Sequence, residues 1–222
     1  MNPAKKILCV FDLDGTLIDS KQAILDSAVR TLESFKVTDF DHTEILESVG
    51  LPIRTVFQNF LQGEILEKAV NQFRSDLLDT GGSSTFLFDD TNSTLEKLHS
   101  DGVTLAVATN KYSYLAKEVL KQQKIEKYFD RVVGADTSPP KPSPDMLKAL
   151  ESEFPEMDLY VMVGDRGEDM MAAKSAGFFS YFIDHGTTHS NSLPSDLTDR
   201  RLTSLDEIVL YIEEDWNLNR DR

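Results

Sequence analysis

The sequence predicts an α/β protein in which helices flank a parallel sheet and a small α-helical cap is inserted after the first strand. Three observations support this prediction. Short apolar runs alternate along the chain with segments of helical periodicity, which is the pattern of a parallel sheet covered by helices. The interval between the first two runs is too long for a simple crossover. Polar residues follow several runs, at the end where open α/β sheets bind ligands.

Five apolar runs are expected to form the strands, and right-handed crossovers between them would bring all strand C-termini to one edge. These runs lie at residues 7–11, 103–108, 131–133, 159–163 and 179–183. Helices are expected at residues 91–100, 112–123, 144–152, 168–176 and 205–213. The segment 186–197 is rich in Thr, Ser, Asn and His, and we predict a surface loop there.

The long interval after the first strand is predicted to be a helical cap on two linkers. Apolar residues recur at helical spacing in 24–35 and again in 65–77, so each stretch presents one apolar face. Gly81-Gly82 is the expected return hinge. The predicted domain division assigns residues 1–18 and 83–222 to the α/β core and residues 19–82 to the cap.

Composition narrows the possible partners. A chain of 222 residues, 40% of them apolar, is long enough for one domain that carries an insert. The net charge of −15 argues against nucleic acid and anionic membranes as partners, because both attract clustered Lys and Arg.

Cys9, the only cysteine, lies in the first apolar run and is predicted to be a small core residue. Too few apolar residues precede Asp12 for a signal peptide or membrane span, which predicts a cytoplasmic protein. The sequence does not distinguish a monomer from a homodimer.

Two acidic residues follow the first predicted strand directly. Asp12 and Asp14 stand in Asp12-Leu13-Asp14-Gly15-Thr16, immediately after the apolar run. Because side chains alternate along a strand, both carboxylates point to the same side, and Gly15 allows a tight turn around whatever lies between them. Two carboxylates that converge on one point suggest a bound metal, a nucleophile or both.

Further polar residues follow the other strands and are expected at the same edge of the sheet. Prolines restrict the backbone on both sides of Lys141, which belongs to this set. The residues are Thr109, Asn110 and Lys111 after the second strand, Lys141 after the third, and Asp165, Arg166, Gly167, Glu168 and Asp169 after the fourth.

This collection of side chains fits phosphoryl transfer. A phosphoryl group in transfer carries charge on three equatorial oxygens, which a metal ion, a cation and hydrogen-bond donors must meet. Mg²⁺ prefers hard oxygen ligands and often keeps waters, so one or two carboxylates suffice to hold it. Without that cation, Asp12 would repel the phosphate that it attacks. We therefore predict Mg²⁺ as the cofactor.

The sequence resembles the haloacid dehalogenase-like superfamily, specifically its phosphatase branch with a helical cap between the first and second motifs. The resemblance covers nearly the whole chain, implies a Rossmann-like core, and is strongest to phosphoglycolate phosphatase-like members. Four motifs appear in order: Asp12-Leu13-Asp14-Gly15-Thr16, Val107-Ala108-Thr109-Asn110-Lys111, Lys141-Pro142, and Gly164-Asp165 through Asp169.

The resemblance implies a catalytic role for each motif residue. Asp12 would be the nucleophile and form an aspartyl-phosphate that water later hydrolyses. Asp14 would be the acid and base, protonating the leaving oxygen and then deprotonating the attacking water. The Thr109 hydroxyl and the Asn110 backbone N–H would hold the phosphoryl oxygens. Lys141 would neutralise these oxygens and orient Asp12.

The resemblance also implies the metal ligands. Asp12 and Asp165 would hold Mg²⁺, together with the backbone carbonyl of Asp14. Asp169 would act through a water molecule or through another ligand. The presence of Asp14 also favours phosphate esters as substrates, because relatives that cleave carbon–halogen bonds lack this second aspartate, and relatives that cleave phosphonates have a small residue there.

One position departs from the pattern of the family. Many relatives carry Ser or Thr after the metal-binding aspartate, whereas this chain has Arg166. Arg166 is expected to pair with Glu168, with Asp169 or with an acidic substrate, and a structural salt bridge is the preferred interpretation.

The predicted cap contains one candidate for substrate recognition. Asp41 is typical of a helix N-cap, and Gly50-Leu51-Pro52-Ile53-Arg54 is similar to the loop and helix start that relatives lower over the active site. Arg54 is a candidate to bind a substrate carboxylate or a second phosphate, and the alternative is a solvated helix arginine. Lys21 and Lys111 flank the motifs and are interpreted as solvated lysines, and the alternative is that they line the entrance of the site. The four histidines have no metal-ligand spacing and are interpreted as surface or loop residues: His42, His99, His185 and His189.

Three functions remain open on the sequence. The first is a Mg²⁺-dependent phosphatase for a small phosphorylated metabolite, either phosphoglycolate-like or a sugar phosphate. The second is a phosphomutase of the β-phosphoglucomutase type, which would use the same aspartyl-phosphate but return the phosphoryl group to a sugar. The third is a receiver-like signalling or binding module. Receivers combine clustered aspartates with Thr and Lys, but they are about half this length and have no helical cap.

Overall fold

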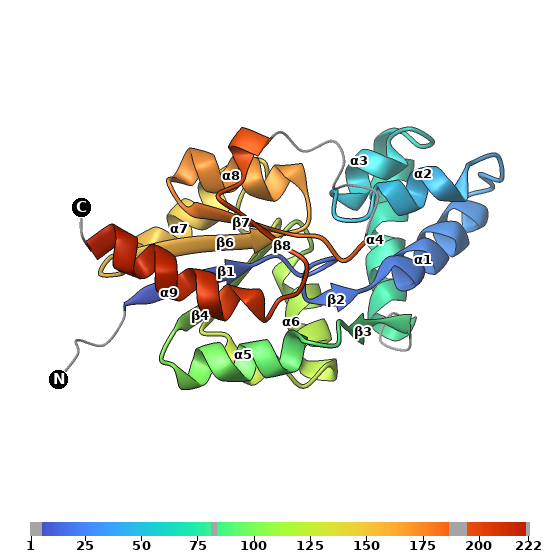
Figure 1. The fold of residues 1–222 in the computed structure, drawn as a ribbon. Coiled ribbons are helices and arrows are strands. Elements are labelled where there is room, and N and C mark those ends of the chain that lie inside the picture. The colour runs from blue at the N-terminus through green and yellow to red at the C-terminus, as the bar shows by residue number, and fades with distance from the viewer. Residues whose placement is uncertain (1–5, 81–83, 187–194, 221–222) are drawn as a thin grey trace.

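The computed structural model describes residues 6–80, 84–186 and 195–220 and confirms the predicted α/β fold (Figure 1). One sheet of six parallel strands forms the centre, in the order β5-β4-β1-β6-β7-β8. The strands are β1 (Ile7–Phe11), β4 (Thr104–Thr109), β5 (Arg131–Gly134), β6 (Leu159–Gly164), β7 (Phe179–Ile183) and β8 (Arg200–Leu202). The first five correspond to the five predicted runs.

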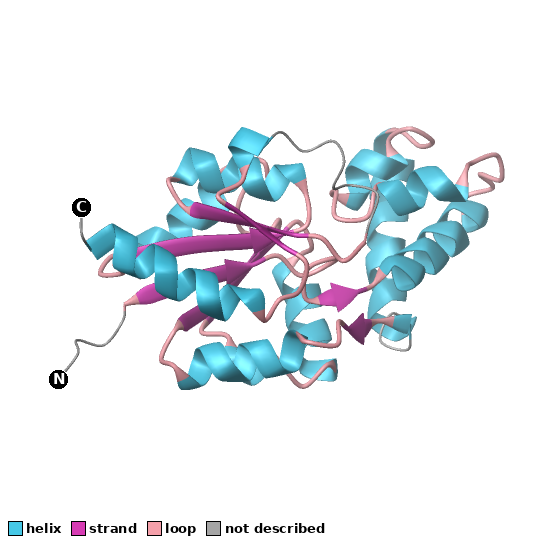
Figure 2. Cartoon of the chain, viewed as in Figure 1, coloured by secondary structure: helices cyan, strands magenta, loops and turns pink. Residues whose placement is uncertain are grey.

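Helices cover both faces of this sheet, as the magenta strands between cyan helices show in Figure 2. The fully buried strand β1 alternates between the two faces. Ile7, Cys9 and Phe11 pack with the first group of helices, and Leu8 and Val10 pack with the second. The first group is α5 (Thr91–Ser100), α6 (Ser113–Gln122) and α9 (Glu207–Arg220), and the second is α7 (Asp145–Glu153) and α8 (Gly167–Ala176).

Four further helices pack on one another around an apolar cluster of their own, and we call them the cap. They lie beyond the carboxyl end of β1, at the right of Figure 1. Ala28, Leu32, Phe57, Val70 and Phe73 are buried between them. The helices are α1 (Lys21–Ser34), α2 (His42–Glu47), α3 (Ile53–Phe57) and α4 (Gly63–Thr80). The cap is thus inserted after the first strand.

The helix starts in the cap follow local sequence signals. The Asp41 side chain accepts a hydrogen bond from the Thr43 backbone N–H at 2.7 Å, so Asp41 is the N-cap of α2, as predicted. Pro52 precedes α3, where its missing N–H costs no helical hydrogen bond. Gly50 has a φ of 97° and turns the chain between these two helices.

The chain leaves and re-enters the core through two short antiparallel strands, β2 (Ile18–Asp19) and β3 (Phe86–Leu87). This pairing was not predicted. Gly81-Gly82, the expected hinge, lies outside the described residues, so the division at residues 18/19 and 82/83 stays a prediction. Residues 187–194, most of the predicted loop, lie outside the described residues, and its last three residues, 195–197, form a short 3-10 helix. Another 3-10 helix spans Glu126–Tyr128. In the described part of the chain, no helix is both long and apolar enough to cross a membrane.

Candidate active site

A tight turn after β1 brings the first acidic motif against the loop that follows β6. Gly15 adopts a φ of 86°, which L side chains rarely do, and its N–H donates to the Ile18 carbonyl at 2.8 Å. A Cβ atom at Gly15 would lie 2.4 Å from Oδ2 of Asp165. The Thr16 hydroxyl donates to the same carboxylate at 3.0 Å. The motif therefore requires glycine at position 15 for two reasons, the positive φ and the close approach of the Asp165 carboxylate.

Alanine substitutions at Gly15 and at Gly102 separate the effect of the positive φ from the effect of the close contact. Gly102 has a φ of 81° but no atom near its Cβ position, so Gly102→Ala introduces only the φ strain. We expect it to lower the free energy of unfolding by about 1 to 2 kcal/mol. We expect Gly15→Ala to lower it by roughly 1 to 3 kcal/mol more, because Asp165 must move away from Thr16. Urea denaturation of both variants measures the difference. Equal losses would show that Asp165 does not constrain this turn.

A buried cluster of three carboxylates and one ammonium lies beside this turn. Lys141 Nζ is 2.8 Å from Oδ1 of Asp12 and 2.6 Å from Oδ1 of Asp169, and it donates to the Ala108 carbonyl at 2.7 Å. Ligand oxygens of Asp12, Asp165 and Asp169 all lie within 4.8 Å of one another. All four charged side chains are buried. Residues from three of the four predicted motifs, which follow β1, β5 and β6, therefore meet at one point.

The backbone around Lys141 is fixed by the loop that follows β4. Lys141 N–H donates to Oδ1 of Asn110 at 2.8 Å, and the Asn110 amide donates back to the Lys141 carbonyl at 3.3 Å. Asn110 also donates to the carbonyl of Gly50 in the cap, at 3.2 Å. The Asn110 side chain, in the loop after β4, therefore binds both the loop that carries Lys141 and the main chain of the cap.

Burial dominates the electrostatics of the cluster. It raises the pKa of Asp12 to about 6, although Lys141 lowers this pKa, and the charge of Asp169 adds to the rise. Burial also raises the pKa of Asp165 well above its usual range, with further contributions from Asp169 and Asp12. For Lys141, burial lowers the pKa, but Asp12 and Asp169 outweigh it and the net shift is upward. One lysine is therefore not enough to make full ionisation of the three carboxylates favourable.

This donor set fits a hard divalent cation. Three buried carboxylates face one ammonium, and buried charges are stable only when they are paired or bind a metal. Oxygen ligands are those that Mg²⁺ prefers. Asp169, which was expected to act indirectly, belongs to the same group of potential ligands as Asp12 and Asp165. The choice between direct and indirect binding by Asp169, and the role of Asp14 as a ligand, stay predictions.

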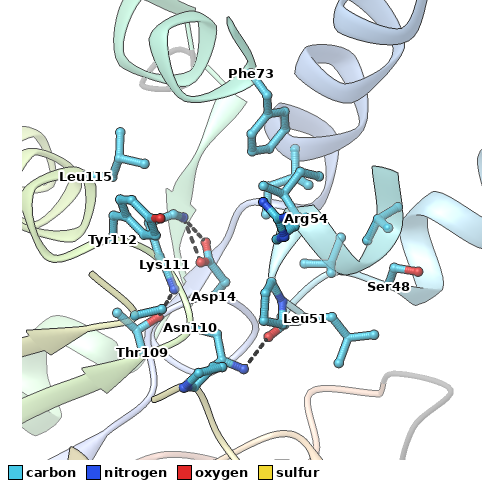
Figure 3. A pocket seen from close by; sticks show the side chains of 18 of the residues that line it. Asp14, Ser48, Leu51, Arg54, Phe73, Thr109, Asn110, Lys111, Tyr112 and Leu115 are labelled. Atoms are coloured by element: carbon cyan, nitrogen blue, oxygen red, sulfur yellow. Dashed lines mark hydrogen bonds and ion pairs between the residues drawn. The ribbon is translucent and has the colours of Figure 1, made fainter. Parts of the chain in front are cut away.

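The Asp14 carboxylate binds two side chains that do not belong to this cluster, and Figure 3 shows one of them, Lys111. Lys111 Nζ lies 2.5 and 2.6 Å from its two oxygens, and the Ser20 hydroxyl donates to Oδ1 at 2.5 Å. The Lys111 side chain is only 9% exposed. The interpretation of Lys111 as a solvated lysine was therefore wrong, because its ammonium is buried against a carboxylate. Lys21 is half-buried.

A cavity of about 220 Å³ opens between the core and the cap. Asp12, Asp14 and Thr109 line its core side (Figure 3). Thr109 is buried, and its Oγ1 accepts the backbone N–H of Lys111 at 3.2 Å. The cap contributes mostly apolar side chains together with two arginines: Ile24, Ile45, Ile53, Val56, Phe73, Leu77, Arg54 and Arg74.

The two cap arginines differ in their partners. Arg54 lines the cavity and forms an ion pair with Glu67 on α4. Its side chain is 55% exposed, so the pair contributes little to stability. The Arg74 guanidinium stacks on the ring of Tyr112 from the core, 3.5 Å from the ring centroid. Both positions are consistent with contact to a bound ligand, and the role of Arg54 stays a prediction.

Two residues near the site make contacts that the sequence did not indicate. His185 lies in a loop, as predicted, but its ring stacks on Phe88 with centroids 3.6 Å apart, and its Nε2 lies 3.1 Å from the Thr16 carbonyl. Arg166 does contact Glu168, but at 3.4 Å, and its guanidinium donates mainly to backbone carbonyls of the cap. His42 and His99 are exposed as expected, and His189 lies outside the described residues.

Comparison with known proteins gives the family. A model of the haloacid dehalogenase-like hydrolase family matches residues 9–183, which include all four motifs. The chain belongs to this family. The matched range begins in β1 and ends in β7, and it therefore contains the cap as well as the sheet residues that carry the acidic cluster.

Relatives within the haloacid dehalogenase-like hydrolases point to phosphatases. The phosphoglycolate phosphatase of Aquifex aeolicus is 33% identical over 90% of this chain and 95% of its own. The putative pyrophosphatase PpaX of Caldanaerobacter subterraneus is 33% identical over 94% of this chain and 91% of its own. The crystal structure of a predicted phosphatase from Clostridium acetobutylicum superposes with a TM-score of 0.83 at 26% identity, covering 95% of this chain and 99% of the other. The chain is an enzyme of this family, a phosphatase.

Proposed function

We propose that the chain is a Mg²⁺-dependent phosphatase that hydrolyses a small phosphorylated metabolite through an aspartyl-phosphate on Asp12. The observation that carries the proposal is the ion pair of Asp12 with Lys141, because Asp12 lines the core side of the cavity together with Asp14. Among the described residues, Lys141 binds Oδ1 of Asp12, which leaves Oδ2 available for attack. A receiver-like signalling module is disfavoured, because such a module has no use for a cavity between the core and a cap.

The first chemical step transfers the phosphoryl group to Asp12. A carboxylate oxygen of Asp12 attacks phosphorus, the ester P–O bond breaks, and Asp14 gives a proton to the leaving oxygen. The Thr109 hydroxyl and the Asn110 backbone N–H bind the phosphoryl oxygens. Mg²⁺ held by Asp12 and Asp165, with the Asp14 carbonyl, would offset the negative charge that develops on those oxygens. Lys141 supplies a positive charge that is already in place.

The second step returns the enzyme to its starting state. Asp14, now ionised, takes a proton from a water molecule that attacks the phosphorus of the aspartyl-phosphate. The bond between phosphorus and the Asp12 oxygen breaks and inorganic phosphate leaves. Lys111 and Ser20 fix the Asp14 carboxylate, so the same group is in position for both proton transfers.

The cavity supports a substrate with a compact body. Its core side holds the phosphoryl machinery, and its cap side combines apolar side chains such as Phe73 with Arg54 and Arg74. An arginine there suits a carboxylate or a second phosphate on the leaving group, because guanidinium binds such groups with two parallel hydrogen bonds. Phosphoglycolate, which the name of the Aquifex relative specifies, carries such a carboxylate. Sugar phosphates are the second class that we propose.

Phosphate release from a panel of esters tests the proposed function. The panel contains phosphoglycolate, sugar phosphates, nucleoside monophosphates and inorganic pyrophosphate. We expect multiple turnover with Mg²⁺, and a loss of at least roughly 10³-fold when EDTA removes the metal, because the metal supplies several kcal/mol of charge stabilisation. Release that persists in EDTA would contradict the proposed cofactor. Conversion of a sugar phosphate to its isomer without release of phosphate would favour the phosphomutase.

A further inference from the structure

Arg166 reaches from the acidic loop of the core to the main chain of the cap. Its Nη1 donates to the Val49 carbonyl at 2.6 Å and to the Glu47 carbonyl at 3.1 Å. Both carbonyls belong to the end of α2 and the loop that follows it. The Arg166 side chain is only 12% exposed. A charged donor with two carbonyl acceptors forms hydrogen bonds that are stronger than neutral ones.

The same cap loop meets a second catalytic loop of the core. The Asn110 amide donates to the Gly50 carbonyl at 3.2 Å, and this contact is drawn in Figure 3. The loop after β4 and the loop after β6 therefore hold three carbonyls of one short cap segment, residues 47–50. Because the acceptors are backbone atoms, these contacts depend on where the cap lies and not on which side chains it carries.

Gly50 makes room for the arginine. A Cβ atom at Gly50 would lie 2.5 Å from Cδ of Arg166. The Arg166 backbone is also fixed, because its N–H donates to Oδ2 of Asp169 at 3.0 Å. Arg166 thus connects the acidic cluster with the cap. Its backbone N–H binds the Asp169 carboxylate, and its guanidinium binds backbone carbonyls of the cap.

We propose that Arg166 is a positioning residue that latches the cap in its closed position over the active site. This inference rests on the proposed function, because a latch matters only if closure completes the site for a substrate. Among the described residues, those that line the cavity do not include Arg166, so its effect on catalysis is indirect. The ion pair with Glu168, at 3.4 Å and partly exposed, contributes little to the latch.

Loss of the latch would reduce the fraction of protein with a closed cap. Apparent substrate affinity falls in proportion to that fraction, while the chemical step in the closed complex is unchanged. For Arg166→Ala we therefore expect KM to rise about 10-fold and kcat to stay within about 2-fold. Arg166→Lys keeps the charge but lacks the planar fork, so we expect an intermediate KM. Glu168→Gln, which leaves both carbonyl contacts in place, is the matched control and should resemble wild type.

Hydrogen exchange of residues 45–57, followed by mass spectrometry in buffer with Mg²⁺ and inorganic phosphate, tests the latch without any turnover. We expect faster exchange in Arg166→Ala than in wild type or in Glu168→Gln. Equal exchange in all three proteins would overturn the proposal, as would a rise in KM that Glu168→Gln reproduces. If wild type hydrolysed no ester, the exchange result would still decide whether the latch exists, so the two proposals fail separately.

A double-mutant cycle gives an independent check that does not require Arg166→Ala to be fully active. In wild type, Gly50→Ala introduces both strain at a φ of 97° and a clash with Arg166. In the Arg166→Ala background only the strain remains, so we expect Gly50→Ala to cost at least about 5-fold less in kcat/KM there. Equal costs in the two backgrounds would show that the side chain does not meet the cap in solution.

Discussion

Asp12→Asn is expected to abolish turnover, with kcat lowered by at least roughly 10⁴-fold, because an amide oxygen cannot act as the nucleophile. The folded state should not suffer. Asp12 is one of three buried carboxylates beside a single lysine, and removal of its charge relieves its repulsion with Asp165 and Asp169. We therefore expect a melting temperature no lower than that of wild type. Steady-state phosphate release and thermal melting measure the two effects.

A surface aspartate provides the control for Asp12→Asn. Asp101 at the end of α5 forms an exposed pair with Lys97, so Asp101→Asn should leave kcat unchanged. If Asp12→Asn kept more than about one hundredth of wild-type kcat, which only general acid–base or binding roles would explain, Asp12 would not be the nucleophile. A large fall in melting temperature would instead indicate that the substitution had damaged the fold.

Asp14→Asn is expected to lower kcat by roughly 10²- to 10⁴-fold on esters with poor leaving groups, because proton transfer in both steps is lost. p-Nitrophenyl phosphate separates the steps, since its leaving group needs no proton. With this ester we expect one equivalent of nitrophenol to appear in a burst, followed by slow turnover as the aspartyl-phosphate waits for water. Rapid-mixing absorbance measurements detect the burst.

Ser20→Ala is the matched comparison for Asp14→Asn. It removes one hydrogen bond to the carboxylate and leaves the carboxylate and its contacts with Lys111 in place. We expect kcat to fall by less than about 10-fold, the value of one hydrogen bond. If Asp14→Asn retained wild-type kcat on both kinds of ester, another residue would have to supply the proton.

Much of the fold was predictable because it follows from local patterns. Strand β1 and its parallel neighbours are continuous apolar runs, and the carboxyl ends of such strands must meet at one edge. Strand β8 was missed because Arg200-Arg201-Leu202 is short and charged, as an edge strand is. The β2–β3 pair was missed because two residues on each side carry no periodicity.

The candidate site shows where sequence reasoning stops. Three of the four motifs predicted that Asp12, Lys141, Asp165 and Asp169 would lie at one edge of the sheet, since Asp12 follows β1, Lys141 follows β5, and Asp165 and Asp169 follow β6. The partners of Asp14 were not predictable, because the distance between Lys111 and Asp14 depends on how two loops pack. Arg166 stood out as a departure from the family pattern, but its acceptors are backbone carbonyls of the cap, which no residue type in the sequence could indicate.

Identification of the phosphorylated residue tests the central claim most directly. Asp14→Asn would be mixed with p-nitrophenyl phosphate and Mg²⁺, denatured, and treated with borohydride, which reduces an aspartyl-phosphate to homoserine. The proposed mechanism predicts homoserine at position 12 in the peptide that contains β1, dependent on both substrate and metal. Homoserine at Asp165 or Asp169 would contradict the assignment of the nucleophile. Phosphate release by wild type without any reduced residue in the trapped variant would contradict the covalent intermediate itself.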